Sequence, residues 1–121
     1  MNQKKTLVIG ASENPERYSN MAIHLLLQNK YSVEAVGLKE GFVSNVHIQK
    51  GYPHFDNIHT VTLYVSPANQ KNYYSYILGL NPKRIIFNPG TENDELKEMA
   101  EDKGIATENA CTLVLLRLNQ Y

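Results

Sequence analysis

Four short, mostly apolar segments with the length of buried β-strands most constrain what this chain can fold into. They lie at residues 6–9 (TLVI), 32–36 (SVEAV), 60–65 (TVTLYV) and 84–87 (RIIF). Between and after them, apolar residues recur at helical spacing in residues 20–29, 66–78 and 91–104. Apolar strands that alternate with amphipathic helices predict a parallel sheet with helices on both faces.

Capping signals set the expected limits of two helices. Ser66 and Pro67 have the residue types of an N-cap and a first helical position. Thr91 supplies a hydroxyl with an acidic residue three positions later, and Gly104 is suited to end the same helix. We therefore expect one helix to begin after Ser66 and another to begin at Thr91.

The remaining segments carry weaker signals. Residues 42–59 contain chain breakers and are expected to form a loop with one short edge strand. Residues 105–107 and 113–116 are apolar, and the second of these runs is either a strand or the start of a final helix. Because crossovers between parallel strands are right-handed, the order of elements predicts one doubly wound, Rossmann-like α/β domain over residues 1–121, with a mostly parallel sheet between two helical layers.

Composition argues against several classes of protein. The 12 Lys and Arg residues equal the 12 Asp and Glu residues, so no overall field attracts nucleic acid or an anionic membrane. The one cysteine, Cys111, cannot form an internal disulfide and is expected to be a small buried residue. No apolar run reaches the length of a membrane span, and the first residues lack the apolar region of a secretory signal. We therefore expect a cytoplasmic protein.

Four turns are expected to converge at one edge of the sheet. In a doubly wound fold, ligands bind beyond the carboxyl ends of the strands, near the point where the strand order reverses. The turns that follow the four predicted strands are residues 10–19, 37–41, 66–67 and 88–90. Residues in these turns are the candidates for a binding site.

The first turn, within the sequence LVIGASENPERYS, has the residues of an anion site. Gly10 permits a sharp turn and close approach by a ligand, and the helix that follows offers unpaired N–H groups. Ser12 and Ser19 add hydroxyl donors, and Arg17 offers a planar, bidentate partner for phosphate. The same residues also suit a structural turn in which Ser19 caps the helix and Arg17 is solvated. The residues alone leave both interpretations open.

The second turn, GLKEG at residues 37–41, bears on the ribose of a nucleotide. Lys39 favours a phosphorylated ribose, whereas Glu40 favours a free 2′-hydroxyl, as in NAD-binding proteins. The first turn lacks the repeated glycines of a dinucleotide fingerprint, which argues against NAD. The two side chains by themselves leave the nucleotide open.

The motifs of this chain resemble those of a known family. They are IGASxxPxRYSN at residues 9–20, VSPAN at 65–69, FNPGTEN at 87–93 and NACTLVLL at 109–116. In sequence and order they are similar to the stand-alone coenzyme A-binding domain proteins, which are single Rossmann domains similar to the coenzyme A-binding domain of the α subunit of succinyl-coenzyme A synthetase. The resemblance spans essentially the whole chain and implies that the ligand is coenzyme A or an acyl derivative.

The resemblance also implies a role for each turn. The residues implied at the diphosphate are Gly10, Ala11, Ser12 and Arg17, with Ser19 and Asn20 nearby. Lys39 is implied at the adenosine and its 3′-phosphate. The residues implied along the adenine or the pantetheine are Val65, Ser66 and Pro67, and those towards the pantetheine arm are Asn88, Pro89 and Gly90. Many relatives carry Asn-Pro where this chain has Gly37 and Leu38, so the adenosine contacts depart from the family pattern.

Three functions are compatible with these residues. The first is a binding module that holds coenzyme A or acyl-CoA and performs no chemistry alone, with no catalytic residue and no metal site. The second is a nucleotide-dependent enzyme of NAD(P) type that uses the same crevice, for which the available polar groups are Ser66, Asn88 and Glu92. The third is an interaction domain without a ligand. A homodimer through residues 113–118, or a partner protein, is left open.

Overall fold

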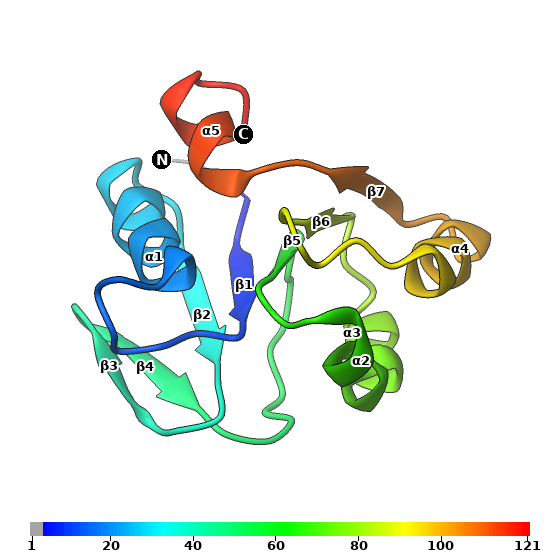
Figure 1. Cartoon of the computed structure of the whole chain (residues 1–121), viewed down its shortest axis with the longest axis horizontal. Helices are drawn as coiled ribbons and strands as arrows, with labels where there is room; N and C mark the ends of the chain where they lie inside the picture. Colours follow the sequence, from blue (N-terminus) through cyan, green and yellow to red (C-terminus); the bar gives the residue numbers. More distant parts are fainter. Residues whose placement is uncertain (1–3) are drawn as a thin grey trace.

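The chain forms one seven-stranded sheet with helices on both faces (Figure 1). A computed structural model describes residues 4–121, so the first three residues of the predicted domain lie outside the described residues. The strands are β1 (Thr6–Ile9), β2 (Val33–Val36), β3 (Gly41–Val43), β4 (Val46–Gln49), β5 (Thr60–Leu63), β6 (Arg84–Phe87) and β7 (Ala106–Asn109). All four strands expected from the apolar segments are present, and the second and third are slightly shorter than predicted.

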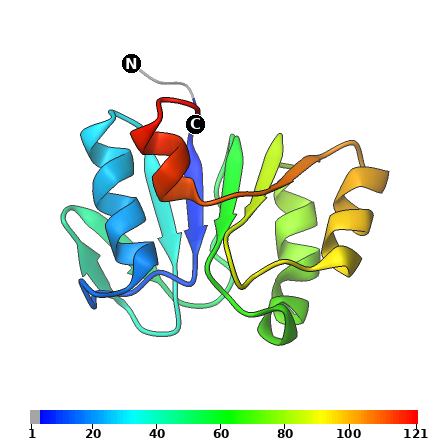
Figure 2. The same cartoon turned by 45° about the horizontal axis from the view of Figure 1, so that its top comes forward.

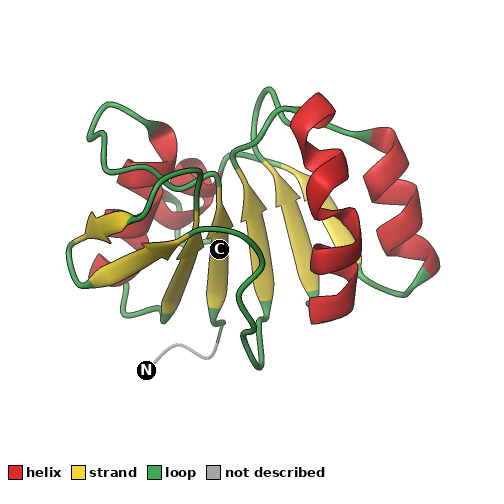
Figure 3. Ribbon diagram, turned by 90° about the horizontal axis from the view of Figure 1, so that it is seen from below, coloured by secondary structure: helices red, strands yellow, loops and turns green. Residues whose placement is uncertain are grey.

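The strand order is β3-β4-β2-β1-β5-β6-β7, which confirms the doubly wound topology. Neighbouring strands run parallel except at β3, which is antiparallel to β4. From β1 the chain moves outward to β2 and the β3–β4 hairpin, and it then returns to the other side of β1 at β5. The order therefore reverses between β1 and β5, and the central strands end at the same edge of the sheet (Figure 3).

The helices form two layers (Figure 2). On one face, α1 (Tyr18–Gln28) and α5 (Thr112–Arg117) pack against each other. On the other face lie α3 (Tyr74–Leu80), which the short segments α2 (Pro67–Gln70) and η1 (Lys71–Tyr73) precede, and α4 (Asp94–Asp102). None of the helices in residues 4–121 is both long and apolar enough to span a bilayer.

Two hydrophobic cores lie on opposite faces of the sheet, because successive side chains of a strand point in opposite directions. In β1, Leu7 and Ile9 belong to the same core as Ile77 of α3 and Leu96 of α4. Val8 belongs instead to the core beneath α1 and α5. All of these side chains are fully buried, which explains why a central strand such as β1 is mostly apolar in the sequence.

The segment at residues 42–59 contains two strands, so the expectation of one edge strand was wrong. β3 and β4 form a hairpin around Ser44 and Asn45, with Ser44 at a φ of 54°. β4 also pairs in parallel with β2, which extends the sheet outward by two strands. The two-residue turn lacks the glycine that usually identifies such hairpins, so the local signal was weak.

Two helices differ from the expected limits. Asn93 caps α4 by accepting a hydrogen bond from the Leu96 N–H at 3.2 Å, so this helix begins after the predicted Thr91. The Thr91 hydroxyl donates instead to the Asn88 carbonyl and closes the preceding turn. The helix predicted after Ser66 is divided into α2, η1 and α3. The apolar run that was left open becomes α5.

Tyr121 fastens the amino end of the sheet. Its side chain is buried, and its hydroxyl shares a hydrogen bond with the hydroxyl of Thr6 in β1. The ring contacts Tyr31 edge to face at 4.9 Å between centroids, and the Arg84 guanidinium lies 4.4 Å from its centroid. These contacts join the segment after α5 to β1 and β6.

We expect Tyr121→Leu to lower the free energy of unfolding by about 2 kcal/mol, because it removes a buried hydrogen bond, a ring pair and a cation–π contact. Urea denaturation would measure this loss. Gln120→Ala, at the adjacent exposed position, is the matched control and should stay within about 0.5 kcal/mol of the original protein. Equal stability of the two variants would contradict the fastening role.

Candidate functional site

The first turn begins where the strand order reverses. The N–H groups of Gly10 and Ala11 both donate to the Val36 carbonyl at the end of β2, at 2.9 and 3.0 Å. On the other side, the Tyr64 N–H donates to the Ile9 carbonyl at 2.8 Å. The turn is therefore held between the carboxyl ends of β2 and β5, which is the place that the topology predicts for it.

Two glycines are required by close backbone approach at this edge. Gly10 has a φ of +95°, and a Cβ atom built there would lie 2.7 Å from the Tyr64 carbonyl oxygen. A Cβ atom at Gly37, which follows β2, would lie 2.4 Å from the Ala11 carbonyl oxygen. A side chain fits at neither position without a shift of the backbone, so the first turn is closely packed against the ends of β2 and β5.

Side-chain hydrogen bonds fix the shape of the first turn. The Ser12 hydroxyl accepts from the Asn14 N–H, and the Asn14 side-chain oxygen accepts from the Glu16 N–H, both at 3.0 Å. The Asn20 amide donates to the Ser12 carbonyl at 3.0 Å. Asn20 and Ser19 are both buried, so these two predicted contact residues lie within α1 beneath the turn. Ser19 does not cap the helix.

The beginning of α1 carries positive charge, and its first turn contains no acidic side chain to balance that charge. Arg17 occupies the N-cap position without a side-chain cap, and the described first turn contains no acidic residue. The Arg17 side chain is exposed and has no ion pair or hydrogen bond with another described residue. The carboxylate of Glu13 is bonded to β3, where it accepts from the Phe42 N–H at 2.9 Å. An anion at this helix end would meet free N–H groups and a free guanidinium.

Asn88, directly after β6, has a buried side chain that forms hydrogen bonds with neighbouring elements. Its amide nitrogen donates to the Thr62 hydroxyl at 2.7 Å and to the Leu63 carbonyl at 2.9 Å. Its side-chain oxygen accepts from the Thr112 N–H at 2.9 Å. The side chain therefore joins β5, β6 and the start of α5, and it lies beneath the exposed residues of its turn.

The third and fourth turns expose most of their predicted contact residues. Ser66 is the N-cap of α2 and Pro67 is its first residue, as the capping signals predict, and both are exposed. Val65, two residues after β5, is half-buried. Pro89 and Gly90 are exposed after β6. These side chains are available to a ligand that crosses the edge of the sheet.

The second turn presents an apolar and a basic side chain to solvent. Leu38 is 86% exposed, and Lys39 is also exposed. The Glu40 carboxylate lies 3.8 Å from the His47 ring nitrogen in β4. Lys39 has no ion pair or hydrogen bond with another residue in the described part of the chain, so it remains available to an anion.

Tyr64 and Cys111 lie near the same edge without an evident chemical role. The Tyr64 hydroxyl is buried and has no hydrogen-bond partner among residues 4–121. Burial raises the pKa of this phenol well above its usual value, so the group stays neutral. Cys111 is partly buried, rather than fully buried as expected. No group of potential metal ligands occurs within the described residues.

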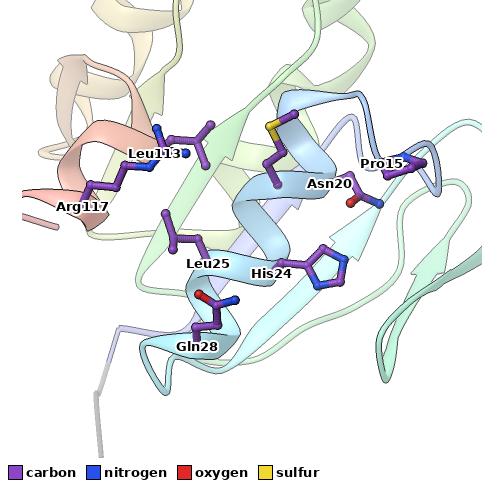
Figure 4. A pocket seen from close by; sticks show the side chains of 8 residues that line it. Pro15, Asn20, His24, Leu25, Gln28, Leu113 and Arg117 are labelled. Atoms are coloured by element: carbon purple, nitrogen blue, oxygen red, sulfur yellow. The ribbon is translucent and has the colours of Figure 1, made fainter.

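A separate groove lies between α1 and α5 (Figure 4). Its walls include His24 and Leu25 of α1 and Leu113 and Arg117 of α5. Of the predicted contact residues, Asn20 alone lines it. The groove therefore follows the helical face, whereas the candidate site follows the ends of the strands.

Four residues that shape the site have no local signal in the sequence. Glu13 and Gly37 act through contacts with β3 and with the first turn, and Gln70 and Asn93 connect the third turn to the fourth. Each contact joins segments that are distant in the chain. Such residues are recognisable only once the turns have been brought together.

A sequence model that describes the coenzyme A-binding domain matches residues 4–117. The chain belongs to the coenzyme A-binding domain family. Membership of this family supports a role in binding coenzyme A. It is also the family that the motifs of the sequence resemble.

Solved structures agree with the fold of this CoA-binding domain protein. One uncharacterized protein is 42% identical, with a TM-score of 0.96 and coverage of 100% of both chains. A hypothetical protein from Pyrococcus horikoshii OT3 is 29% identical, with a TM-score of 0.85 over 96% of this chain and 84% of its own. A protein from Thermus thermophilus, 16% identical with a TM-score of 0.85 over 100% of both chains, shares the fold. No curated protein sequence matches the chain significantly.

Proposed function

We propose that this CoA-binding domain protein holds coenzyme A or an acyl derivative, with the diphosphate at the beginning of α1. The observation that carries the proposal is a first turn of α1 without an acidic residue beside the exposed Arg17 guanidinium. The absence of a side chain at Gly10 lets the first turn pack against the Tyr64 carbonyl, so the turn that leads into α1 is held where the strand order reverses. Family membership supports coenzyme A as the source of this diphosphate.

The remaining turns bind the two ends of the ligand in this proposal. The exposed Lys39 binds the 3′-phosphate, and the adjacent Leu38 provides an apolar surface at the adenosine. Val65, Ser66 and Pro67 lie along the adenine or the pantetheine, and the turn of Asn88, Pro89 and Gly90 faces the pantetheine arm. Because the Asn88 side chain is fully hydrogen-bonded inside the protein, this turn contributes chiefly its backbone and its exposed residues.

A binding module fits these contacts better than an enzyme. Of the polar groups available for proton transfer, Asn88 is committed to three bonds within the protein. The Glu92 carboxylate accepts from the Gly90 N–H at 2.8 Å and so stabilises the fourth turn. Within residues 4–121, neither side chain is hydrogen-bonded or ion-paired to an acidic or basic side chain that would activate it for catalysis.

We expect Arg17→Ala to weaken coenzyme A binding by about tenfold, because one charge-assisted phosphate contact is removed at a partly solvated site. Isothermal titration calorimetry of the purified protein would measure the dissociation constant. Lys83→Ala is the matched control, because it removes an exposed cation before β6 at the opposite edge of the sheet. The control should bind coenzyme A like the original protein.

Two other ligands make the result specific to the proposed arrangement. 3′-Dephospho-coenzyme A should bind more weakly than coenzyme A if Lys39 contacts the 3′-phosphate, and equal affinities would remove that role. NAD should not bind. Heat of binding with NAD but none with coenzyme A would overturn the proposed ligand. No heat of binding with any of the three compounds would favour an interaction domain without a ligand.

A further inference from the structure

Gln70, the last residue of α2, is a fully buried polar residue at the carboxyl edge of the sheet. Its amide nitrogen donates to the Val65 carbonyl at 2.8 Å and to the Thr91 carbonyl at 2.7 Å. Its side-chain oxygen accepts from the Asn93 amide at 2.9 Å. One side chain therefore bridges the turn after β5 and the turn after β6.

Asn93 extends this bridge into the helical layer. Its amide nitrogen also donates to the Tyr74 hydroxyl at 2.8 Å, and its oxygen caps α4. The Tyr74 hydroxyl donates in turn to the Glu95 carboxylate at 3.0 Å. The connection from Gln70 thus ends on α3 and α4, so the spacing of the two turns is tied to rigid helices.

Because the Gln70 side chain forms hydrogen bonds with three polar partners, few other side chains can replace it. An apolar side chain at Gln70 would leave the bonds to the Val65 and Thr91 carbonyls unmade, and an asparagine would be shorter by one methylene. Buried polar groups that lose their partners are costly, so a substitution favours a shift of one turn towards solvent. The shift would change the distance between Val65 and the exposed pair Pro89 and Gly90.

We propose that Gln70 is a positioning residue that sets the separation of the two turns along the pantetheine arm, an inference that rests on the proposed function. Gln70 acts through the backbone of Val65 and Thr91. The bonds that hold the first turn lie between its N–H groups and the Val36 carbonyl and between the Tyr64 N–H and the Ile9 carbonyl, and none of them uses the Val65 carbonyl. Of the two positions proposed for Val65, Ser66 and Pro67, this inference takes the one along the pantetheine, so loss of the bridge weakens binding of the pantetheine arm and leaves binding of the nucleotide unchanged.

The test compares two ligands on Gln70→Met, which keeps the length of the side chain and removes its polar atoms. Coenzyme A carries the pantetheine arm, whereas adenosine 3′,5′-bisphosphate is its nucleotide portion alone. We expect calorimetry to show a loss of about tenfold or more for coenzyme A and a change of less than about threefold for the bisphosphate. A merely destabilised protein would lose affinity for both ligands in proportion to its unfolded fraction.

Two further variants keep the test decisive. Tyr121→Leu is destabilised at the opposite edge of the sheet, and at a temperature where it is fully folded it should bind both ligands with the affinities of the original protein. Asn93→Ser retains a capping hydroxyl for α4 but removes the amide that contacts Gln70, so it should show a smaller, selective loss even if Gln70→Met does not fold. If the original protein binds coenzyme A, and the variants that fold bind each ligand as tightly as the original protein does, the positioning role is wrong and the proposed function stands. If the original protein does not bind coenzyme A, both proposals fail.

Discussion

Replacing Gly10 with alanine is expected to lower the free energy of unfolding by about 2 to 5 kcal/mol and to weaken coenzyme A binding by more than about tenfold. The φ of +95° disfavours any L side chain, and the new Cβ would lie 2.7 Å from the Tyr64 carbonyl oxygen. To relieve this contact, the first turn must move away from the end of β5. That motion displaces the backbone proposed to meet the diphosphate.

Two measurements separate the parts of this effect. Urea denaturation gives the stability loss, and calorimetry at a temperature where the variant is folded gives the affinity. Gly104→Ala is the matched control for backbone conformation, because its φ is +80° and nothing lies within 4 Å of an added Cβ. The control should lower the free energy of unfolding by about 1 kcal/mol and should leave the affinity for coenzyme A unchanged. If Gly10→Ala lowered the free energy of unfolding by no more than Gly104→Ala does, the contact with Tyr64 would be easily relieved.

Gly37→Ala is expected to cost about 3 kcal/mol for a different reason. The added Cβ would lie 2.4 Å from the Ala11 carbonyl oxygen and 2.9 Å from the Ile48 side chain. The carbonyl belongs to the backbone and cannot rotate away, so β2 and the first turn must separate. The cost comes from steric overlap, since Gly37 is not among the residues with a positive φ.

The same substitution at Gly79 provides the contrasting control. Nothing lies within 4 Å of a Cβ added at Gly79, which is inside α3. Gly79→Ala should therefore stabilise the protein by about 0.5 to 1 kcal/mol, because alanine restricts the unfolded chain and favours the helix. Thermal unfolding of the two variants should shift in opposite directions. A Gly37 variant as stable as the original protein would contradict the close packing of the first and second turns.

The positions of the central parallel strands along the chain could be predicted because their signals are local. Segments such as TLVI and RIIF are apolar after their first residue, since both faces of their strands are covered. The turn after β1 was also identifiable, because a glycine follows a buried strand and precedes a helix. The β3–β4 hairpin was not, because its strands are short and Ser44–Asn45 carries no characteristic glycine.

The candidate site was predictable to a smaller extent. Its exposed residues, including Arg17 and Lys39, stand in turns whose place follows from topology, and their contacts with a ligand stay a prediction. The buried amides of Asn20 and Asn88 proved to be bonded within the protein, which no local pattern indicates. A side chain's residue type shows what it can bind, whereas its partners depend on which segments lie beside it.

The sequence by itself determined the alternation of strands and helices, the edge of the sheet that the turns follow, and the family to which the motifs are similar. These depend on hydrophobic periodicity and on short motifs, which act over a few neighbouring residues. The tertiary structure alone decided that Gly37 must lack a side chain and that Gln70 joins two turns. Both depend on atoms from distant parts of the chain, and their approach within a few ångströms is settled only when the whole sheet has packed.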